Sequence, residues 1–132
     1  MNKENTLKLL NTFPKLYSNF HANYRPERKI PFEFQCRDGW FQLIWNLSQK
    51  LETEIVAIKA ISNSNIPSAI QVKEKMGTLR FYMSVYVETI QNEIRAAWEF
   101  SKTTCEVCGE LGELRGEGKW KYTLCYKHRD EI

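Results

Sequence analysis

The stretch Ala69–Val85, AIQVKEKMGTLRFYMSV, decides the fold of this chain because apolar and polar side chains alternate on both sides of Gly77-Thr78. Such alternation predicts two antiparallel strands with one buried face. A two-residue loop that begins with glycine favours a type II′ turn. The predicted register makes these cross-strand pairs: Met76 with Leu79, Lys75 with Arg80, Glu74 with Phe81, Lys73 with Tyr82 and Val72 with Met83.

The alternation gives the predicted hairpin an apolar and a polar face. The apolar face comprises Ile70, Val72, Glu74, Met76, Leu79, Phe81 and Met83. Directly opposed cations on the polar face repel each other unless an anion lies between them. We therefore predict an anion site there, with an exposed, solvated strand as the alternative. Its candidate ligand-binding residues are Lys73, Lys75, Arg80 and Tyr82.

Helices are predicted on both sides of the hairpin. Upstream, apolar residues recur every three or four positions from Trp40 to Ile58, with Asp38 as the N-cap. Residues 6–20 show helical spacing interrupted by Pro14, which predicts two short helical segments. A further helix is predicted over 87–102. The expected core comprises Trp40, Ile44, Leu47, Leu51, Val72, Phe81 and Ile94.

A cysteine pattern near the C-terminus has the spacing of a metal site. It reads C-x2-C-x16-C-x2-H from Cys105, and Gly109 supports the first turn. A hairpin is expected over Leu114–Leu124, followed by the second ligand pair on the first turn of a helix. Four protein ligands close a tetrahedral site, so the metal should be structural. The sequence predicts one structural Zn²⁺ held by Cys105, Cys108, Cys125 and His128.

Two other interpretations of these cysteines are open. Disulfides need an oxidising compartment, and nothing in the sequence indicates export. A thioredoxin-like redox pair needs a βαβ setting, which the sequence does not show. The predicted organisation is an α+β core domain of residues 1–104 and a zinc module of residues 105–132 packed on it. The predicted fold class is thus α+β, with amphipathic helices packed on a small antiparallel hairpin sheet.

The ligand spacing resembles that of the GATA-type zinc fingers, with His128 where that family has cysteine. A treble-clef zinc module has the same order of elements: a Cys-x-x-Cys turn, called the knuckle, then a hairpin, then two ligands at the start of a helix. The resemblance implies DNA binding, but GATA fingers use a helix and a basic extension that Tyr126–Ile132 does not offer. HNH nucleases use the same scaffold with a catalytic histidine on the hairpin. Residues 109–124 contain no histidine, which excludes that activity.

The stretch Gln71–Tyr82, followed by a helix and Thr104–Gly109, is similar to small uncharacterised proteins encoded by phages and prophages. This resemblance implies a cytoplasmic accessory protein that acts on host machinery or modulates host defence. It supplies no catalytic residues.

Composition excludes several classes of protein. The 132 residues are 42% hydrophobic and carry a net charge of +3, without a basic tail. No apolar run approaches the ~18–20 residues of a membrane span. The first residues lack the apolar region of a secretory signal. We expect a cytoplasmic protein with no membrane partner.

No familiar catalytic arrangement is present in the sequence. His21 is expected to be a surface loop residue, and Cys36 a buried thiol beside Phe32, Phe34 and Trp40. A phosphate-binding glycine loop is missing. Glu74 on the apolar face is expected to form an ion pair with Arg95. We therefore predict a protein that is not an enzyme, with an uncommon enzyme as the open alternative.

The predicted function is that of a non-catalytic, zinc-stabilised binding protein. Its expected partner is an anionic small molecule such as a nucleotide, or an acidic surface of a host protein. The alternative is a nucleic-acid-binding regulator that uses the zinc module. The residues that would contact phosphates in that regulator are Lys119, Lys121, Lys127 and Arg129. The protein is also a possible homo-oligomer on this prediction.

Overall fold

A central β-hairpin organises the molecule, seen here in a computed structural model that describes residues 1–29 and 32–132. The strands of the first sheet are β1 (Phe34–Gln35), β2 (Ala69–Lys75) and β3 (Thr78–Met83), in the order β1-β2-β3. The pair β2–β3 is antiparallel, and β1 lies parallel to β2. The helices are α1 (Lys3–Thr12), α2 (Ser18–Asn23), α3 (Phe41–Ile61) and α4 (Glu88–Ser101).

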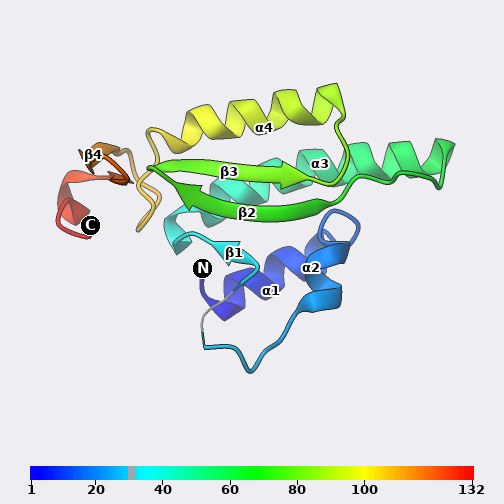
Figure 1. The fold of residues 1–132 in the computed structure, drawn as a ribbon, viewed down its shortest axis with the longest axis horizontal. Helices are drawn as coiled ribbons and strands as arrows, with labels where there is room; N and C mark the ends of the chain where they lie inside the picture. Colours follow the sequence, from blue (N-terminus) through cyan, green and yellow to red (C-terminus); the bar gives the residue numbers. More distant parts are fainter. Residues whose placement is uncertain (30–31) are drawn as a thin grey trace.

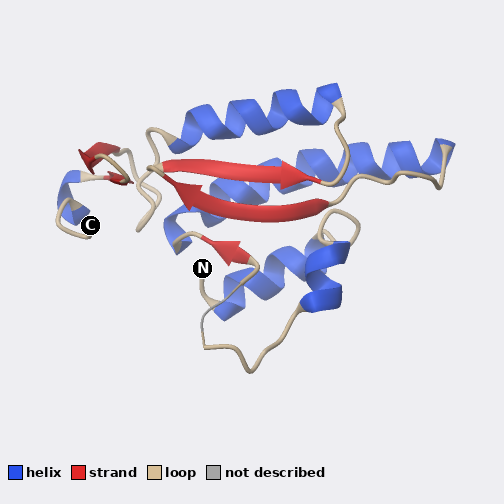
Figure 2. Ribbon diagram, viewed as in Figure 1, coloured by secondary structure: helices blue, strands red, loops and turns tan. Residues whose placement is uncertain are grey.

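The helices cover one face of the hairpin and one of its edges. In Figure 1, α3 passes behind β2 and β3, while α4 runs beside β3. A second sheet of β4 (Glu113–Glu117) and β5 (Trp120–Leu124) lies at the turn end of the hairpin, near the C-terminus (Figure 2). The predicted α+β class is confirmed. No helix within the described ranges has the length and apolar character that crossing a bilayer requires.

The hydrophobic core lies between the hairpin, α3 and the N-terminal helices. Six of the seven predicted core residues are buried, and Ile94 is partly buried against them. Tyr17, at the start of α2, packs edge-on against Phe34 of β1, with ring centroids 5.1 Å apart. Its hydroxyl lies 2.6 Å from the Ser48 hydroxyl of α3, so this buried polar group is satisfied. The aromatic cluster ties the two short N-terminal helices to the sheet.

The hairpin turns earlier than predicted. Met76 and Gly77 are its central residues, with φ angles of 53° and 82°. Two positive φ angles define a type I′ turn, so the predicted type II′ turn is wrong. The register moves by an even number of residues, and each side chain therefore keeps its predicted face. The pairs that replace the predicted ones are Lys75 with Thr78, Glu74 with Leu79, Lys73 with Arg80, Val72 with Phe81 and Gln71 with Tyr82.

Contacts from outside the turn explain its position. The backbone N–H of Gly77 donates to Glu74 Oε2 (2.7 Å), and the Thr123 hydroxyl donates to the Gly77 carbonyl (2.7 Å). A left-handed Met76 costs of order 1–3 kcal/mol. Both backbone polar groups of Gly77 are thus satisfied, which offsets that cost. Glu74 is engaged in the turn, and the predicted Glu74–Arg95 pair is not among the ion pairs of the described residues.

Two smaller predictions are also corrected. A β-bulge between Ala69 and Gln71 buries Ala69 and leaves Ile70 49% exposed, although Ile70 was expected on the apolar face. Asp38 is not the N-cap of α3, because a 3-10 turn over Asp38–Trp40 precedes that helix. The Asp38 carboxylate instead accepts the backbone N–H of Asn2 (2.8 Å) at the start of α1.

Candidate metal centre

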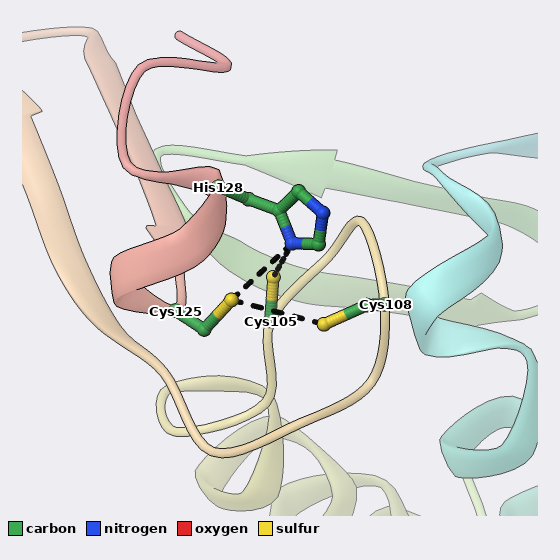
Figure 3. Close-up of side chains that lie close together, drawn as sticks. All are labelled: Cys105, Cys108, Cys125 and His128. Carbon is green, nitrogen blue, oxygen red and sulfur yellow. Dashed lines mark hydrogen bonds between the residues drawn. The ribbon is translucent and has the colours of Figure 1, made fainter.

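Three cysteines and one histidine from two separate segments converge near the C-terminus (Figure 3). The first pair lies in the turn that follows α4, and the second pair lies directly after β5. The β4–β5 hairpin returns the chain to its starting point, which brings the two pairs together. This Cys3His cluster contains the four predicted ligands, Cys105, Cys108, Cys125 and His128.

The spacing of the ligand atoms matches a tetrahedral metal site. All four atoms lie within 4.8 Å of one another. The Sγ atoms of Cys108 and Cys125 are 3.8 Å apart, and His128 Nδ1 lies 3.2 Å from Cys125 Sγ and 3.8 Å from Cys105 Sγ. Two sulfurs bonded at ~2.3 Å to a tetrahedral zinc are separated by about 3.8 Å. All four cysteines of the chain are free thiols. The cluster can therefore hold a metal ion.

The knuckle that carries the first two cysteines has the backbone a metal turn needs. The N–H of Gly109 donates to the carbonyl of Cys105 (2.8 Å), and Gly109 has a φ of +83°, which L side chains rarely adopt. The Cys105 N–H in turn donates to the Glu110 carbonyl (2.7 Å). These bonds close the turn around the two sulfurs.

Hydrogen bonds to sulfur prepare Cys105 for a cation. Burial acts to raise the pKa of this thiol, but the backbone N–H groups of Cys125, Cys108 and Val107, together with His128, outweigh it and lower the pKa to about 6. The thiolate is the form that binds metal. At Cys108, the N–H of Glu110 acts to lower the pKa, yet burial and the neighbouring thiols raise it overall. One negative charge is already favoured in the cluster.

The knuckle is anchored to the core through the 3-10 turn that precedes α3. The N–H of Gly39 donates to the carbonyl of Glu106 (2.8 Å), and the Trp40 indole N–H donates to the carbonyl of Thr104 (2.8 Å). A Cβ at Gly39 would overlap the carbonyl oxygen of Cys105. The cluster is therefore packed directly against the fold, without a linker.

A buried carboxylate reinforces this anchor. Glu106 is 2% exposed, and its Oε2 accepts the backbone N–H of Arg37 (3.0 Å). Burial raises its pKa to about 7; the Arg37 N–H bond opposes the shift, and the charge of Glu74 adds to it. Its Oε1 has no hydrogen-bond partner in the part of the chain that the structure describes.

The predicted helix after Cys125 is not present. Cys125 is followed by a 3-10 turn of three residues, Tyr126–His128, whose backbone closes with a bond from the His128 N–H to the Cys125 carbonyl (3.1 Å). A Cys-x-x-His pair needs only one such turn to point both side chains to one side. The knuckle and the β4–β5 hairpin agree with the prediction.

The predicted ligand-binding residues lie away from the cluster, on the hairpin face that no helix covers in Figure 1. We call this the open face. Lys73 and Arg80 are opposed across β2 and β3, whereas Lys75 is exposed at the turn end opposite Thr78. The open face comprises Gln71, Lys73, Lys75, Thr78, Arg80 and Tyr82.

Sequence reasoning missed the part of this surface that α4 supplies. A groove of about 330 Å³ runs between β3 and α4. Its α4 side comes from Gln91, Ile94, Arg95 and Trp98, whose spacing of three or four residues places them on one stripe of the helix. That spacing is visible in the sequence, but the position of α4 along the edge of β3 is not.

The remaining candidates for chemistry lie apart from the Cys3His cluster. His21 is exposed and its Nε2 lies 3.2 Å from Asn11 Oδ1. Cys36 is 7% exposed, as predicted, and burial raises the pKa of its thiol to about 12. A thiol in this state is a poor nucleophile.

Comparison of the chain with protein-family models, curated proteins and solved structures finds no match. The functional assignment therefore rests on the residues themselves.

Proposed function

We propose that this chain is a non-catalytic, zinc-stabilised binding protein that holds an anionic ligand on the open face of the hairpin. The observation that carries the proposal is the cross-strand pair of Lys73 and Arg80. Like charges directly opposite on a sheet are destabilising. Neither cation is in an ion pair among the described residues. An anion between them would turn this repulsion into attraction.

The state of the Arg80 side chain supports the same proposal. Its Nε atom is buried and has no hydrogen-bond partner within the described ranges. A buried donor left unpaired costs about 1–3 kcal/mol, more for a charged group. Phosphate and carboxylate oxygens match the fork of a guanidinium. A bound anion would stabilise the charge of this partly buried guanidinium.

Zinc is the metal we assign to the Cys3His cluster. Three thiolates and one imidazole are a common structural zinc set, and with four protein ligands no position is left for water. The ion would cross-link the knuckle to the end of β5 and supply no reaction. The knuckle and the β4–β5 hairpin support a treble-clef-like module, in which the 3-10 turn takes the place of the helix.

The test uses inorganic pyrophosphate as the probe and the purified, zinc-loaded full chain. Lys73→Glu/Arg80→Glu should abolish the pyrophosphate affinity measured by calorimetry, because repulsion replaces attraction. The matched control is Lys119→Glu/Lys127→Glu, which reverses two exposed cations of residues 105–132. Because the double variant replaces one like-charged cross-strand pair by another, its thermal midpoint should change little. Unaltered binding by the hairpin variant would refute the proposal.

A nucleic-acid-binding regulator is the second candidate. Two aromatic side chains of the zinc module are exposed, each with a cation over its ring: Lys119 lies 5.8 Å from the Trp120 centroid and Arg129 lies 4.0 Å from that of Tyr126. Such pairs suit stacked bases. However, residues 105–132 hold six acidic against five basic side chains, which weakens attraction to phosphates. Steep loss of DNA binding with added salt, and its loss in the Lys119→Glu/Lys127→Glu control, would favour this candidate.

From the resemblance to phage-encoded proteins we also propose a role in modulating host defence. In that setting the ligand or the acidic protein would belong to the host, and binding would modulate host defence.

A further inference from the structure

The β3–α4 groove continues the open face and has the side chains of a nucleotide site. Its lining residues are Leu79, Arg80, Phe81, Tyr82, Gln91, Ile94, Arg95 and Trp98. None of them is acidic, although the chain carries 16 acidic residues. The groove therefore holds two guanidinium groups, two aromatic rings with polar edges and one amide on apolar walls.

The two arginines reach the groove from different elements. Arg80 comes from β3 and Arg95 from α4, so a ligand between them would be held from both sides. Arg95 is exposed and, like Arg80, is in no ion pair among the described residues. Lys73 lies beside Arg80 on the open face. Together these three cations can neutralise a ligand group that carries more than one negative charge.

The aromatic side chains indicate what the rest of the ligand is. Tyr82 is 44% exposed on β3, and Trp98 lies across the groove on α4. The Lys102 ammonium lies 3.9 Å from the centroid of the Trp98 ring and makes a cation–π contact with it. Planar bases stack on aromatic side chains because every base has a π-face. The Gln91 amide adds a donor and an acceptor for a base edge.

A buried serine side chain joins the two walls of the groove. The Ser101 hydroxyl of α4 accepts the backbone N–H of Leu79 on β3 (3.0 Å) and donates to the Trp98 carbonyl (2.6 Å). Ser101 is fully buried. The groove is thus a preformed feature, and its volume of about 330 Å³ falls at the lower end of the ~300–1,000 Å³ typical of small-ligand sites.

We propose that the β3–α4 groove binds a 5′-nucleotide unit, with the base on Tyr82 and Trp98 and the phosphates between Arg80, Arg95 and Lys73. This inference rests on the proposed function, because it uses the same anion site. It adds the class of ligand and the residues of α4. The unit can be a free nucleotide or part of a single strand, and these share the same chemistry.

The experiment compares AMP, ATP, inorganic pyrophosphate and a short single-stranded oligonucleotide on the zinc-loaded full chain by calorimetry. The test variants are Tyr82→Leu and Arg95→Gln, both at exposed positions. The matched controls are Tyr86→Leu and Lys59→Gln, which are exposed residues outside the groove lining. We expect ATP to bind more tightly than pyrophosphate. Tyr82→Leu should weaken ATP binding about tenfold and leave pyrophosphate binding unchanged, whereas Arg95→Gln should weaken both.

The outcomes separate this inference from the proposed function. If pyrophosphate binds as tightly as ATP and Tyr82→Leu changes neither, the anion site stands and the nucleotide inference is overturned. Absence of binding by every probe at low salt would overturn both. Binding of the oligonucleotide but not of AMP or ATP, still weakened by Tyr82→Leu, supports the nucleotide unit and assigns it to a strand. Capture of a polyglutamate peptide in place of every nucleotide would overturn the inference in favour of an acidic protein surface.

Discussion

The Thr123 hydroxyl of β5 donates a buried 2.7 Å hydrogen bond to the carbonyl of Gly77 in the β2–β3 turn, 46 residues away in the chain. Thr123 is fully buried, and its own carbonyl accepts the N–H of Glu106 in the metal knuckle (2.9 Å). One residue thus joins the Cys3His cluster to the hairpin that carries the open face. We infer that the metal module supports the shape of the turn as well as its own fold.

The first prediction concerns this bond. Thr123→Val keeps the size of the side chain but leaves the buried Gly77 carbonyl without its donor, which should lower the free energy of unfolding by about 1–3 kcal/mol. Urea denaturation measures it. Thr53→Val is the matched control, because the Thr53 hydroxyl donates to Gln49 in an exposed position, where the loss should be small. Equal midpoints for the two variants would contradict a structural role for the Thr123–Gly77 bond.

A second prediction tests how tightly the knuckle fits the core. A Cβ at Gly39 would overlap the backbone carbonyl groups of Cys105 and Glu106, which cannot rotate away. Gly39→Ala should therefore destabilise the protein by about 1–3 kcal/mol or more and weaken metal retention against a chelator. Gly118→Ala is the control: its Cβ meets nothing within 4 Å, and only its φ of +56° is unfavourable. Full metal retention in the Gly39 variant would show that the knuckle can shift without loss.

The sequence was most informative where local spacing determines the outcome. The Cys3His ligands were predicted because a C-x2-C turn and a C-x2-H turn each fix two ligands by local geometry. The two faces of the hairpin were predicted because Val72 and Phe81 follow a period of two, and both are buried.

Long-range contacts explain what the sequence did not reveal. The turn lies at Met76-Gly77 because Thr123 and Glu74 satisfy Gly77, and the Thr123 contact spans two sheets. The α4 side of the groove was missed for a similar reason. It depends on the buried Ser101 bond to the edge of β3, which no local pattern encodes.

A third prediction concerns the metal. Freshly purified protein should carry one zinc ion per chain by elemental analysis, and Cys108→Ser or His128→Ala should release it. Loss of zinc should speed amide hydrogen exchange over residues 105–132 and at the Met76-Gly77 turn, because Thr123 connects them. Lys127→Ala, an exposed neighbour of the ligands, should leave both readouts unchanged. A Cys105–Cys108 disulfide in the native chain, or protein without metal from unchelated preparations, would contradict the assignment.

The last prediction follows from the buried thiol of Cys36. Burial raises its pKa to about 12; the amino group of Met1 opposes the shift, and the charges of Glu106, Asp38 and Glu74 add to it. An unfolded cysteine ionises near 8.5, so the unfolded state releases a proton where the folded state does not. The resulting stabilisation is complete below pH 8.5 and is lost as the pH rises toward 12, by up to ~1.4 kcal/mol per pH unit. Cys36→Ala should therefore flatten the decline of stability between pH 9 and pH 11, measured by urea denaturation at each pH.

A thiol reagent at pH 8 should label Cys36 only after unfolding, while chelation alone should expose the three cluster cysteines. Rapid labelling of Cys36 in the folded protein would contradict the burial of this thiol.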